Sequence, residues 1–572
     1  MLKKTEGQKG SYVAHNGQSF QNGMGLDRYY PLSGKKLLEE VLRHPDSSKL
    51  IPKLPSGDFF WLVKKVGEDD CLQLLALASL KQWQYLFDLE VWGEDRLDTE
   101  EIFRWFRRLQ SADPARFAKW LLRRGQALAY YYFFRSIQVE VMEEEDDFDP
   151  EDGFFSLDGL FYIRVLQNDR RETIEGILRT MADEDLLRYQ AILSGLAGVL
   201  PAEFEEEMYR LRNTRLAEHG FLPYEEAVAV YAPLDHGALL RDGSKADIFF
   251  PIPDEEIGDL APYSPLHYAN SRNLLAITTS RIDDGRLLDR LRLEFAGLCN
   301  KVLSADRLRV NDLETLINVC RRVAGYLNLA LEEGSGEDVR TSEIFLRNNP
   351  LASLFRVGFG LALKLKWETE RWLKRSWFNR NGLGHDFWGD EWGDIISGLI
   401  EKRPRCFCGH KSGDRYKDFE HVSELESCRE VLHRLIGLDN LFEFLAGSYP
   451  LDKELLMASD LTFHPFLLTL WARQLLALEP SFEGISLNQA RRFIHLLRSR
   501  DKGSPYRMPG FKELFIDHFT AFASELTPAA SATLGNTLSL IWQGFRQEYD
   551  RVSEDSLDPR FSRYILITPL PQ

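Results

Sequence analysis

The sequence predicts a mainly α-helical protein, a multi-helical array or superhelix in two halves, with a minor β element near residues 137–165. Three observations lead to this expectation. Apolar residues recur at helical spacing from about Gly57 to Leu109, and again through most of Leu287–Arg551. Residues that commonly cap helices precede several of these stretches. No motif within them identifies a reaction, so helix packing dominates the pattern.

The N-terminal part is predicted to consist of a flexible tail, residues 1–30, and a helical domain, residues 31–235. Its first long helices carry large apolar side chains on several faces, which indicates burial. These helices are expected at Asp58–Val66, Asp70–Ser79 and Gln82–Val91. Asp98 can cap the next helix because its carboxylate reaches the first-turn amides, and Glu101 stands three residues later.

An acidic stretch interrupts the helical pattern at residues 140–152, which contain nine acidic residues. Such dense like charge usually stays solvated, so we expect a loop there. Directly after it, Asp158-Gly159 separates two short apolar runs, and this pair is typical of a tight hairpin turn. We therefore expect a hairpin, with Ile137–Val141 as a third strand; a helix is the alternative.

The second half begins after a predicted linker at residues 236–264, which is rich in glycine, proline and acidic residues and has little helical period. A C-terminal helical domain is expected at residues 265–572, with helix-capping patterns at Asn311 and Ser486. The segment Arg563–Thr568 has a β-rich composition and is expected to pair with an extended segment elsewhere.

Residues 70–106 and 185–231 share short similarities. These indicate either an internal repeat of stacked helical units or a chance likeness between amphipathic helices.

Charge and composition exclude some classes of function. The chain has 71 basic and 88 acidic residues, a formal net charge of −17, which argues against general nucleic-acid binding. No apolar run reaches the roughly 18–20 residues that a membrane span needs. Residues 1–24 lack the apolar stretch of a secretory signal. With six cysteines and no visible disulfide framework, we expect a cytoplasmic protein in a reducing compartment.

Two resemblances add to this reading. The Leu/Ala rhythm of Glu68–Ala78, within Leu54–Phe106, resembles the helical cytoplasmic N-terminal domain of bacterial magnesium transporters, which implies a superhelix of short helices. The transporter's nucleotide-sensing modules and membrane helices have no counterpart here. That segment together with Arg215–Ala227 is similar to an uncharacterised bacterial family, a domain of unknown function frequent in anaerobic delta-proteobacteria. The second resemblance implies a bacterial cytosolic protein and no mechanism.

A cluster of cysteine and histidine residues is the first candidate for local chemistry. Thiolate and imidazole ligands suit a tetrahedral zinc ion. The candidate ligands are Cys406, Cys408, His410, His421 and Cys428. His421 and Cys428 are seven residues apart and would share a helix face. The Cys-x-Cys spacing departs from the usual zinc motifs, so the alternative is a loop with reduced thiols beside a partly buried helix. Zinc is the one cofactor that the sequence suggests.

The second candidate is the segment Trp377–Asp394, which contains four glycines and three tryptophans. Its one histidine, His385, stands near Asp386, Asp390 and Glu391. These groups could perform acid–base chemistry if they converge in a cleft. The alternative is that the aromatic side chains cover an adjoining core while the glycines allow close turns.

Abundant helical surface without a recognisable catalytic constellation favours a non-catalytic, cytoplasmic protein-interaction or scaffold protein with an unidentified protein partner. One alternative is an enzyme whose site lies in the C-terminal half near His385. Another is a zinc-stabilised or redox-responsive regulator that uses the cysteine and histidine cluster.

Overall fold

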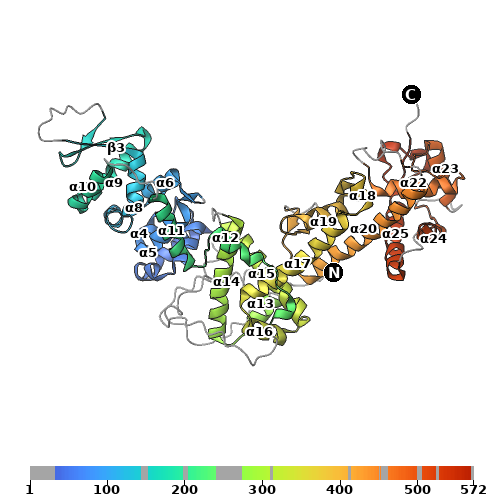
Figure 1. The fold of residues 1–572 in the computed structure, drawn as a ribbon, viewed down its shortest axis with the longest axis horizontal. Coiled ribbons are helices and arrows are strands. Elements are labelled where there is room, and N and C mark those ends of the chain that lie inside the picture. The colour runs from blue at the N-terminus through green and yellow to red at the C-terminus, as the bar shows by residue number, and fades with distance from the viewer. Residues whose placement is uncertain are drawn as a thin grey trace, which may run out of the picture. The chain divides into compact units, whose positions relative to one another are not determined.

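The computed structural model describes residues 33–93, 95–142, 153–196, 204–239, 273–308, 313–409, 414–449, 451, 461–498, 505–522 and 527–568. Helices dominate these ranges, and the strands are short and belong to small sheets (Figure 1). The prediction of a mainly α-helical protein with a minor β element is therefore confirmed. The predicted tail, most of the acidic stretch and most of the predicted linker lie outside the described residues.

The chain divides into two compact units. The first contains the described residues of Met1–Val230 and Ile282–Cys320. The second contains the described residues of Tyr231–Lys245, Ala269–Arg281 and Arg321–Gln572. The domain boundaries expected from the sequence stay a prediction.

The first unit is built mainly from short helices. They are α1 (Gly34–Arg43), α2 (Ser47–Leu50), η2 (Ile51–Lys53), α3 (Ser56–Val66), α4 (Leu72–Leu77), α5 (Leu80–Glu90), α6 (Thr99–Ala112), α7 (Pro114–Leu121), α8 (Gln126–Ser136), η3 (Asn168–Arg170), α9 (Arg171–Glu184), α10 (Leu186–Leu196), α11 (Phe204–Ala217), α12 (Tyr224–Ala227), η4 (Val228–Tyr231) and α14 (Gly285–Asp306). The predicted cap at Asp98 is confirmed, because its carboxylate accepts hydrogen bonds from the backbone N–H groups of Glu100 and Glu101.

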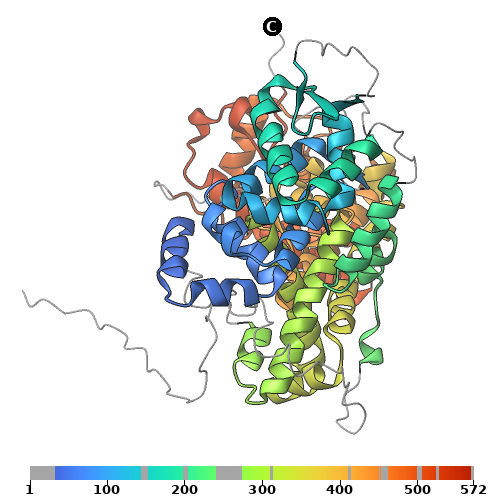
Figure 2. The same ribbon diagram turned by 90° about the vertical axis from the view of Figure 1, so that its left-hand side faces the viewer.

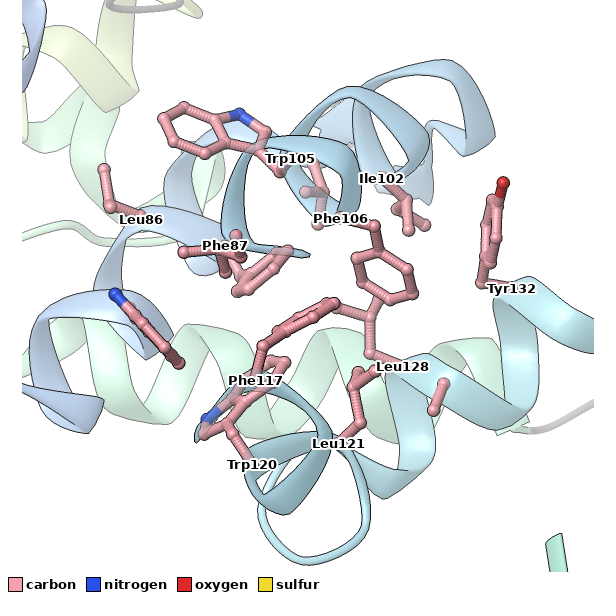
Figure 3. Packing of buried hydrophobic residues seen from close by; sticks show 14 of the residues in the cluster. Leu86, Phe87, Ile102, Trp105, Phe106, Phe117, Trp120, Leu121, Leu128 and Tyr132 are labelled. Atoms are coloured by element: carbon pink, nitrogen blue, oxygen red, sulfur yellow. The ribbon is translucent and has the colours of Figure 1, made fainter. Parts of the chain in front are cut away.

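Large aromatic side chains fill the core of this unit (Figure 3). Phe87 of α5 stacks on Trp120 of α7, with 4.8 Å between the ring centroids. Phe106 of α6 meets Phe117 and Tyr132 edge to face, at 5.2 and 5.0 Å. All five rings are almost completely buried, so these aromatic pairs hold α5 to α8 around one centre.

The predicted β element is a three-stranded antiparallel sheet with the order β3-β5-β4. Its strands are β3 (Ile137–Val141), β4 (Phe155–Ser156) and β5 (Phe161–Val165), and a separate two-residue pair joins β1 (Trp92–Gly93) to β2 (Arg96–Leu97). Asp158 and Gly159 form the expected turn: Gly159 has a φ of +76°, and the Asp158 carboxylate accepts from the N–H groups of Leu160 and Phe161. Figure 2 shows the sheet beside the helices that precede and follow it.

The second unit contains longer helices. Its elements are η5 (His236–Ala238), α13 (Leu274–Thr279), α16 (Val339–Asn348), α17 (Leu351–Leu373), α18 (Trp377–Arg380), η6 (His385–Trp388), α19 (Asp390–Ile400), β6 (Cys406–Phe407), β7 (Tyr416–Lys417), α20 (Val422–Ser448), α22 (Phe463–Leu475), α23 (Leu487–Leu497), α24 (Phe511–Phe522), α25 (Pro528–Tyr549), η7 (Glu554–Ser556) and η8 (Pro559–Phe561). Helix α15 (Leu313–Ser335) begins in the first unit and continues into the second. In the described ranges, no helix combines the length and apolarity that crossing a bilayer requires.

Local sequence signals in this unit are also confirmed. Ser486 forms a reciprocal capping box at the start of α23. Ile567 pairs in parallel with Ile485, so the C-terminal segment does join an extended piece of chain. Asn311, the other expected cap, lies outside the described residues.

Candidate functional site

The aromatic side chains of the segment 377–394 are part of the core of the second unit. Trp377, Phe387 and Trp388 are buried, with 6%, 3% and 1% of their surface exposed. Trp377 stacks on Phe442 of α20, and Phe387 meets the same ring edge to face. These contacts match the alternative reading of the segment, in which its tryptophans cover an adjoining core.

A buried carboxylate that the sequence analysis did not single out holds this segment in place. Asp439 of α20 is 3% exposed. Its Oδ2 accepts from Trp372 Nε1 at 3.2 Å and from the Trp377 N–H at 3.0 Å, and its Oδ1 accepts from the Phe378 N–H at 3.0 Å. Burial raises the pKa of Asp439, and these hydrogen bonds oppose that rise. The sequence signal that could have identified it is an aspartate, followed by Asn440, within a largely apolar part of α20.

His385 contacts a serine and not the neighbouring acids. Its Nδ1 lies 3.0 Å from Ser397 Oγ, and Ser397 Oγ lies 2.9 Å from the Gly393 carbonyl oxygen. Because a hydroxyl has a single hydrogen, Ser397 donates either to the Gly393 carbonyl or to His385 Nδ1; when it donates to Gly393, His385 Nδ1 is the donor to Ser397. Burial lowers the pKa of His385, which favours the neutral ring.

The three acidic candidates near His385 are exposed: Asp386, Asp390 and Glu391. The structure therefore does not gather them around the imidazole within a buried site. The acid that is buried is Asp394, on the next turn of α19. It forms an ion pair with Arg415, whose Nη2 lies 2.5 Å from Asp394 Oδ1.

The two candidate segments lie next to each other through this ion pair. Arg415 belongs to the short hairpin formed by β6 and β7, and the Arg405 N–H donates to the Gly398 carbonyl of α19 at 2.9 Å. A Cβ atom at Gly398 would lie only 2.7 Å from the Arg405 carbonyl oxygen, so glycine is what permits this close approach. Helix α19 thus supports the hairpin that carries the first two candidate cysteines.

Two candidate thiols lie on this hairpin and on α20. Cys406 of β6 and Cys428 of α20 are both buried. The influence of the Cys428 side chain, followed by burial, raises the pKa of Cys406, while the Cys406 side chain lowers the pKa of Cys428. Cys408 is exposed. An ion pair between Lys417 and Glu424, at 2.5 Å, fastens the hairpin to α20 beside the thiols.

His421 has a different set of neighbours. Its Nδ1 lies 2.8 Å from Glu332 Oε1 of α15, and Glu332 Oε2 accepts from the Val422 N–H at 2.8 Å. Buried Asn328 donates to the same Glu332 side chain and to the Glu420 carbonyl. This network joins the start of α20 to α15.

The zinc site stays a prediction. Within the described ranges, no three histidine, cysteine, aspartate or glutamate side chains are arranged so that they could hold a metal ion. His410, one of the five candidate ligands, lies outside the described residues. The described residues instead include two buried thiols, Cys406 and Cys428, and the exposed thiol of Cys408 two residues after Cys406.

Comparison with known protein families identifies a family for this chain. A model described as "Family of unknown function (DUF6178)" matches residues 26–568, nearly the whole chain. No curated protein and no solved structure matches the chain. The match supplies no activity, so a function must be argued from the geometry.

Proposed function

This chain belongs to the family of unknown function DUF6178, and we propose that it is a non-catalytic interaction protein that binds an extended segment of a partner protein at the edge of β3. The observation that carries this proposal is the open edge of β3 beside an acidic stretch. The polar groups that the sequence offered for catalysis are consistent with it, because Asp386, Asp390 and Glu391 are exposed and do not surround His385, which is hydrogen-bonded to Ser397.

The register of β3 decides which of its backbone groups are free of β5. The Met142 N–H donates to the Leu160 carbonyl, and the Leu166 N–H donates to the Ser136 carbonyl. In an antiparallel pair, residues alternate between facing the partner strand and facing away from it. Val139 and Val141 therefore direct their N–H and C=O groups away from β5.

That side of β3 is an edge of the sheet, since the strand order is β3-β5-β4 and no other strand of the described residues continues it. An edge with unpaired backbone groups can accept an additional strand. Main-chain hydrogen bonds to Val139 and Val141 would supply the affinity of such a complex.

An exposed apolar side chain lies at one end of this edge. Val141, which pairs with Phe161 of β5, is 47% exposed. Apolar exposure at a strand edge invites aggregation unless it is used for binding or is protected by charge. A partner segment with alternating apolar residues would cover the Val141 side chain.

Charge indicates the nature of the partner. Eight of the nine acidic residues of the stretch 140–152 lie in the connection between β3 and β4, Glu140 lies in β3 itself, and the whole chain has a net charge of −17. Such a field attracts basic segments and repels acidic ones. We infer that the partner segment alternates apolar residues with lysine or arginine. Free thiols at all six cysteines support a reducing compartment, the cytoplasm, as the place of binding.

The test uses the full-length chain and a fluorescent peptide of alternating lysine and valine, with binding followed by fluorescence anisotropy. The variant Val141→Pro removes an N–H that points away from β5, so the existing ladder is kept while strand addition is blocked. We expect it to weaken binding by about tenfold or more. The matched control Val141→Thr keeps both the N–H and the β-branched shape and should bind like wild type. Equal binding by Val141→Pro and wild type, or no binding by wild type, would contradict the proposal.

A further inference from the structure

We propose that an exposed face at the end of α17 binds an acidic segment of a partner protein, one that carries an apolar side chain between its acids. We call this face the α17 stripe; it consists of one tryptophan among four basic residues, namely Lys364, Trp367, Arg371, Lys374 and Arg375. The stripe lies in the second unit, and the inference does not depend on the binding site proposed at β3.

The spacing of these residues places them on one face of the helix. Side chains three, four or seven residues apart in an α-helix lie one above the other. Lys364, Trp367, Arg371 and Lys374 follow this spacing, and Arg375 lies four residues after Arg371. Lys374, the C-terminal cap, still has helical backbone angles. All five residues are exposed, so the stripe faces solvent.

Other segments cover the remaining surface of α17. Tyr231 packs against Phe355 and Phe359 near the start of the helix, and further along the same segment Asp235 pairs with Lys364 at 3.3 Å. Helices α19 and α20 also contact α17 (Figure 1). The stripe begins where this cover reaches Lys364.

The two acidic residues on this half of α17 already have basic partners. Glu370 pairs with Lys366 at 3.5 Å, and Lys366 also donates to the last carbonyls of α19. On the other side of the stripe, Glu368 contacts Arg429 and His433 of α20 at 4.0 and 3.1 Å. Neither carboxylate is therefore free to neutralise the stripe.

Three cations of the stripe stay uncompensated. Within the described ranges, Arg371, Lys374 and Arg375 form no ion pair, and the one side-chain hydrogen bond of Arg371 goes to the Trp367 carbonyl. Like charges this close repel one another, and carboxylates brought to the stripe would relieve that repulsion. A single exposed ion pair contributes little, so binding needs several carboxylates together with an apolar contact.

Trp367 supplies the apolar contact. All twelve tryptophans lie in the described ranges, and Trp367, at 44%, is the one that is exposed. Tryptophan and arginine are the residues that most often dominate the binding energy of protein interfaces. An apolar side chain of the partner would cover this ring while the acids on either side of it reach the flanking cations.

The surroundings favour a protein segment over a phosphate polymer or a membrane. The chain has a net charge of −17, which repels polyanions at long range. Glu368 and Glu370 border the stripe on its two sides, and a continuous phosphate backbone laid across it would meet them. A single ring offers little apolar surface for insertion into a bilayer. Carboxylates spaced along a peptide can match the cations and avoid both acids.

The experiment uses the full-length chain and a fluorescent peptide of glutamates around one phenylalanine, with binding followed by fluorescence anisotropy. We expect binding that weakens as sodium chloride is added. Trp367→Ala should weaken it by about tenfold or more, whereas Phe561→Ala, which removes another exposed ring of the second unit, should bind like wild type. Arg371→Gln should weaken it by about fivefold, and Arg560→Gln, which removes an exposed cation outside the stripe, should not.

Any of three results would overturn the inference. One is no binding of the peptide by wild type, and another is equal binding by Trp367→Ala and Phe561→Ala. The third is tighter binding of wild type to single-stranded RNA or to phosphatidylserine vesicles than to the peptide. Val141→Pro should bind the glutamate peptide like wild type, so failure of the site at β3 is distinguishable from failure of the stripe.

Discussion

Asp439 illustrates how single polar residues act in this protein. It accepts three hydrogen bonds from groups that the chain brings together around the start of α18. A carboxylate with three donors in a buried position fixes the backbone of the aromatic segment more firmly than apolar contacts alone. Buried polar side chains such as Asp439 therefore position helices in this protein.

Replacing Asp439 by alanine should therefore destabilise the protein. Three buried N–H groups would lose their acceptor, at a cost of about 3 kcal/mol in the free energy of unfolding. Urea denaturation followed by tryptophan fluorescence measures this loss. The control is Glu443→Gln, which breaks an exposed ion pair with Arg380 and should leave the denaturation midpoint unchanged. Equal midpoints for the two variants would contradict the anchoring role.

Asp58 in α3 makes stability depend on pH. It is 4% exposed, and burial raises its pKa from 3.8 to about 7. Because the folded-state pKa is raised above the unfolded value, the protonated acid favours folding. Its contribution is fully present below about pH 3.8 and is lost as the pH rises through about 7.

The variant Asp58→Asn removes this titration. At pH 8 the variant should be more stable than wild type by up to about 4 kcal/mol, since about three pKa units separate the folded and unfolded acid. At pH 4 the two proteins should be nearly equal. Urea denaturation at both pH values gives the difference, and a variant that is less stable than wild type at pH 8 would show that the ionised carboxylate is favoured instead.

At the scale of the elements, local signals predicted much of the fold. Side-chain caps at Asp98 and Ser486 and the turn at Asp158-Gly159 act over a few residues, so the sequence displays them directly. Contacts between distant elements leave no such local mark. The hydrogen bond between His385 and Ser397 could not be ranked above other pairings before the helices were placed.

A close helix crossing is another feature that the sequence did not reveal. Gly358 of α17 packs against the backbone of Tyr326 in α15, and a Cβ atom at Gly358 would overlap the Tyr326 carbonyl. Glycine is required here by contact with a second helix, although within one helix it lowers stability.

Gly358→Ala should thus lower the free energy of unfolding by about 1–3 kcal/mol, because α15 and α17 must move apart. Thermal unfolding measured by circular dichroism is suitable. Gly447→Ala in α20 is the matched control, since a Cβ atom there meets nothing within 4 Å. It should raise stability by up to about 1 kcal/mol. If both substitutions stabilise the protein, the helices do not cross at Gly358 as described.

At the scale of the whole molecule, the periodicity of apolar residues predicted the fold class because burial of apolar faces drives helix packing. Membership of a family of unknown function was also apparent from the sequence. The repeat between residues 70–106 and 185–231 and the resemblance to magnesium transporters stay predictions. The geometry around His385 could not be predicted from the sequence. His385 and its acidic neighbours are adjacent in sequence, but the imidazole is hydrogen-bonded to Ser397 of α19 and the acids are exposed.

Binding of an extended basic segment at the edge of β3 can be followed amide by amide. Hydrogen–deuterium exchange of the full-length chain, with and without the lysine–valine peptide, is the measurement. We expect slower exchange at the amides of Val139 and Val141, which point away from β5, on peptide binding. Unchanged exchange in β3, with protection appearing at residues 385–394 instead, would contradict it.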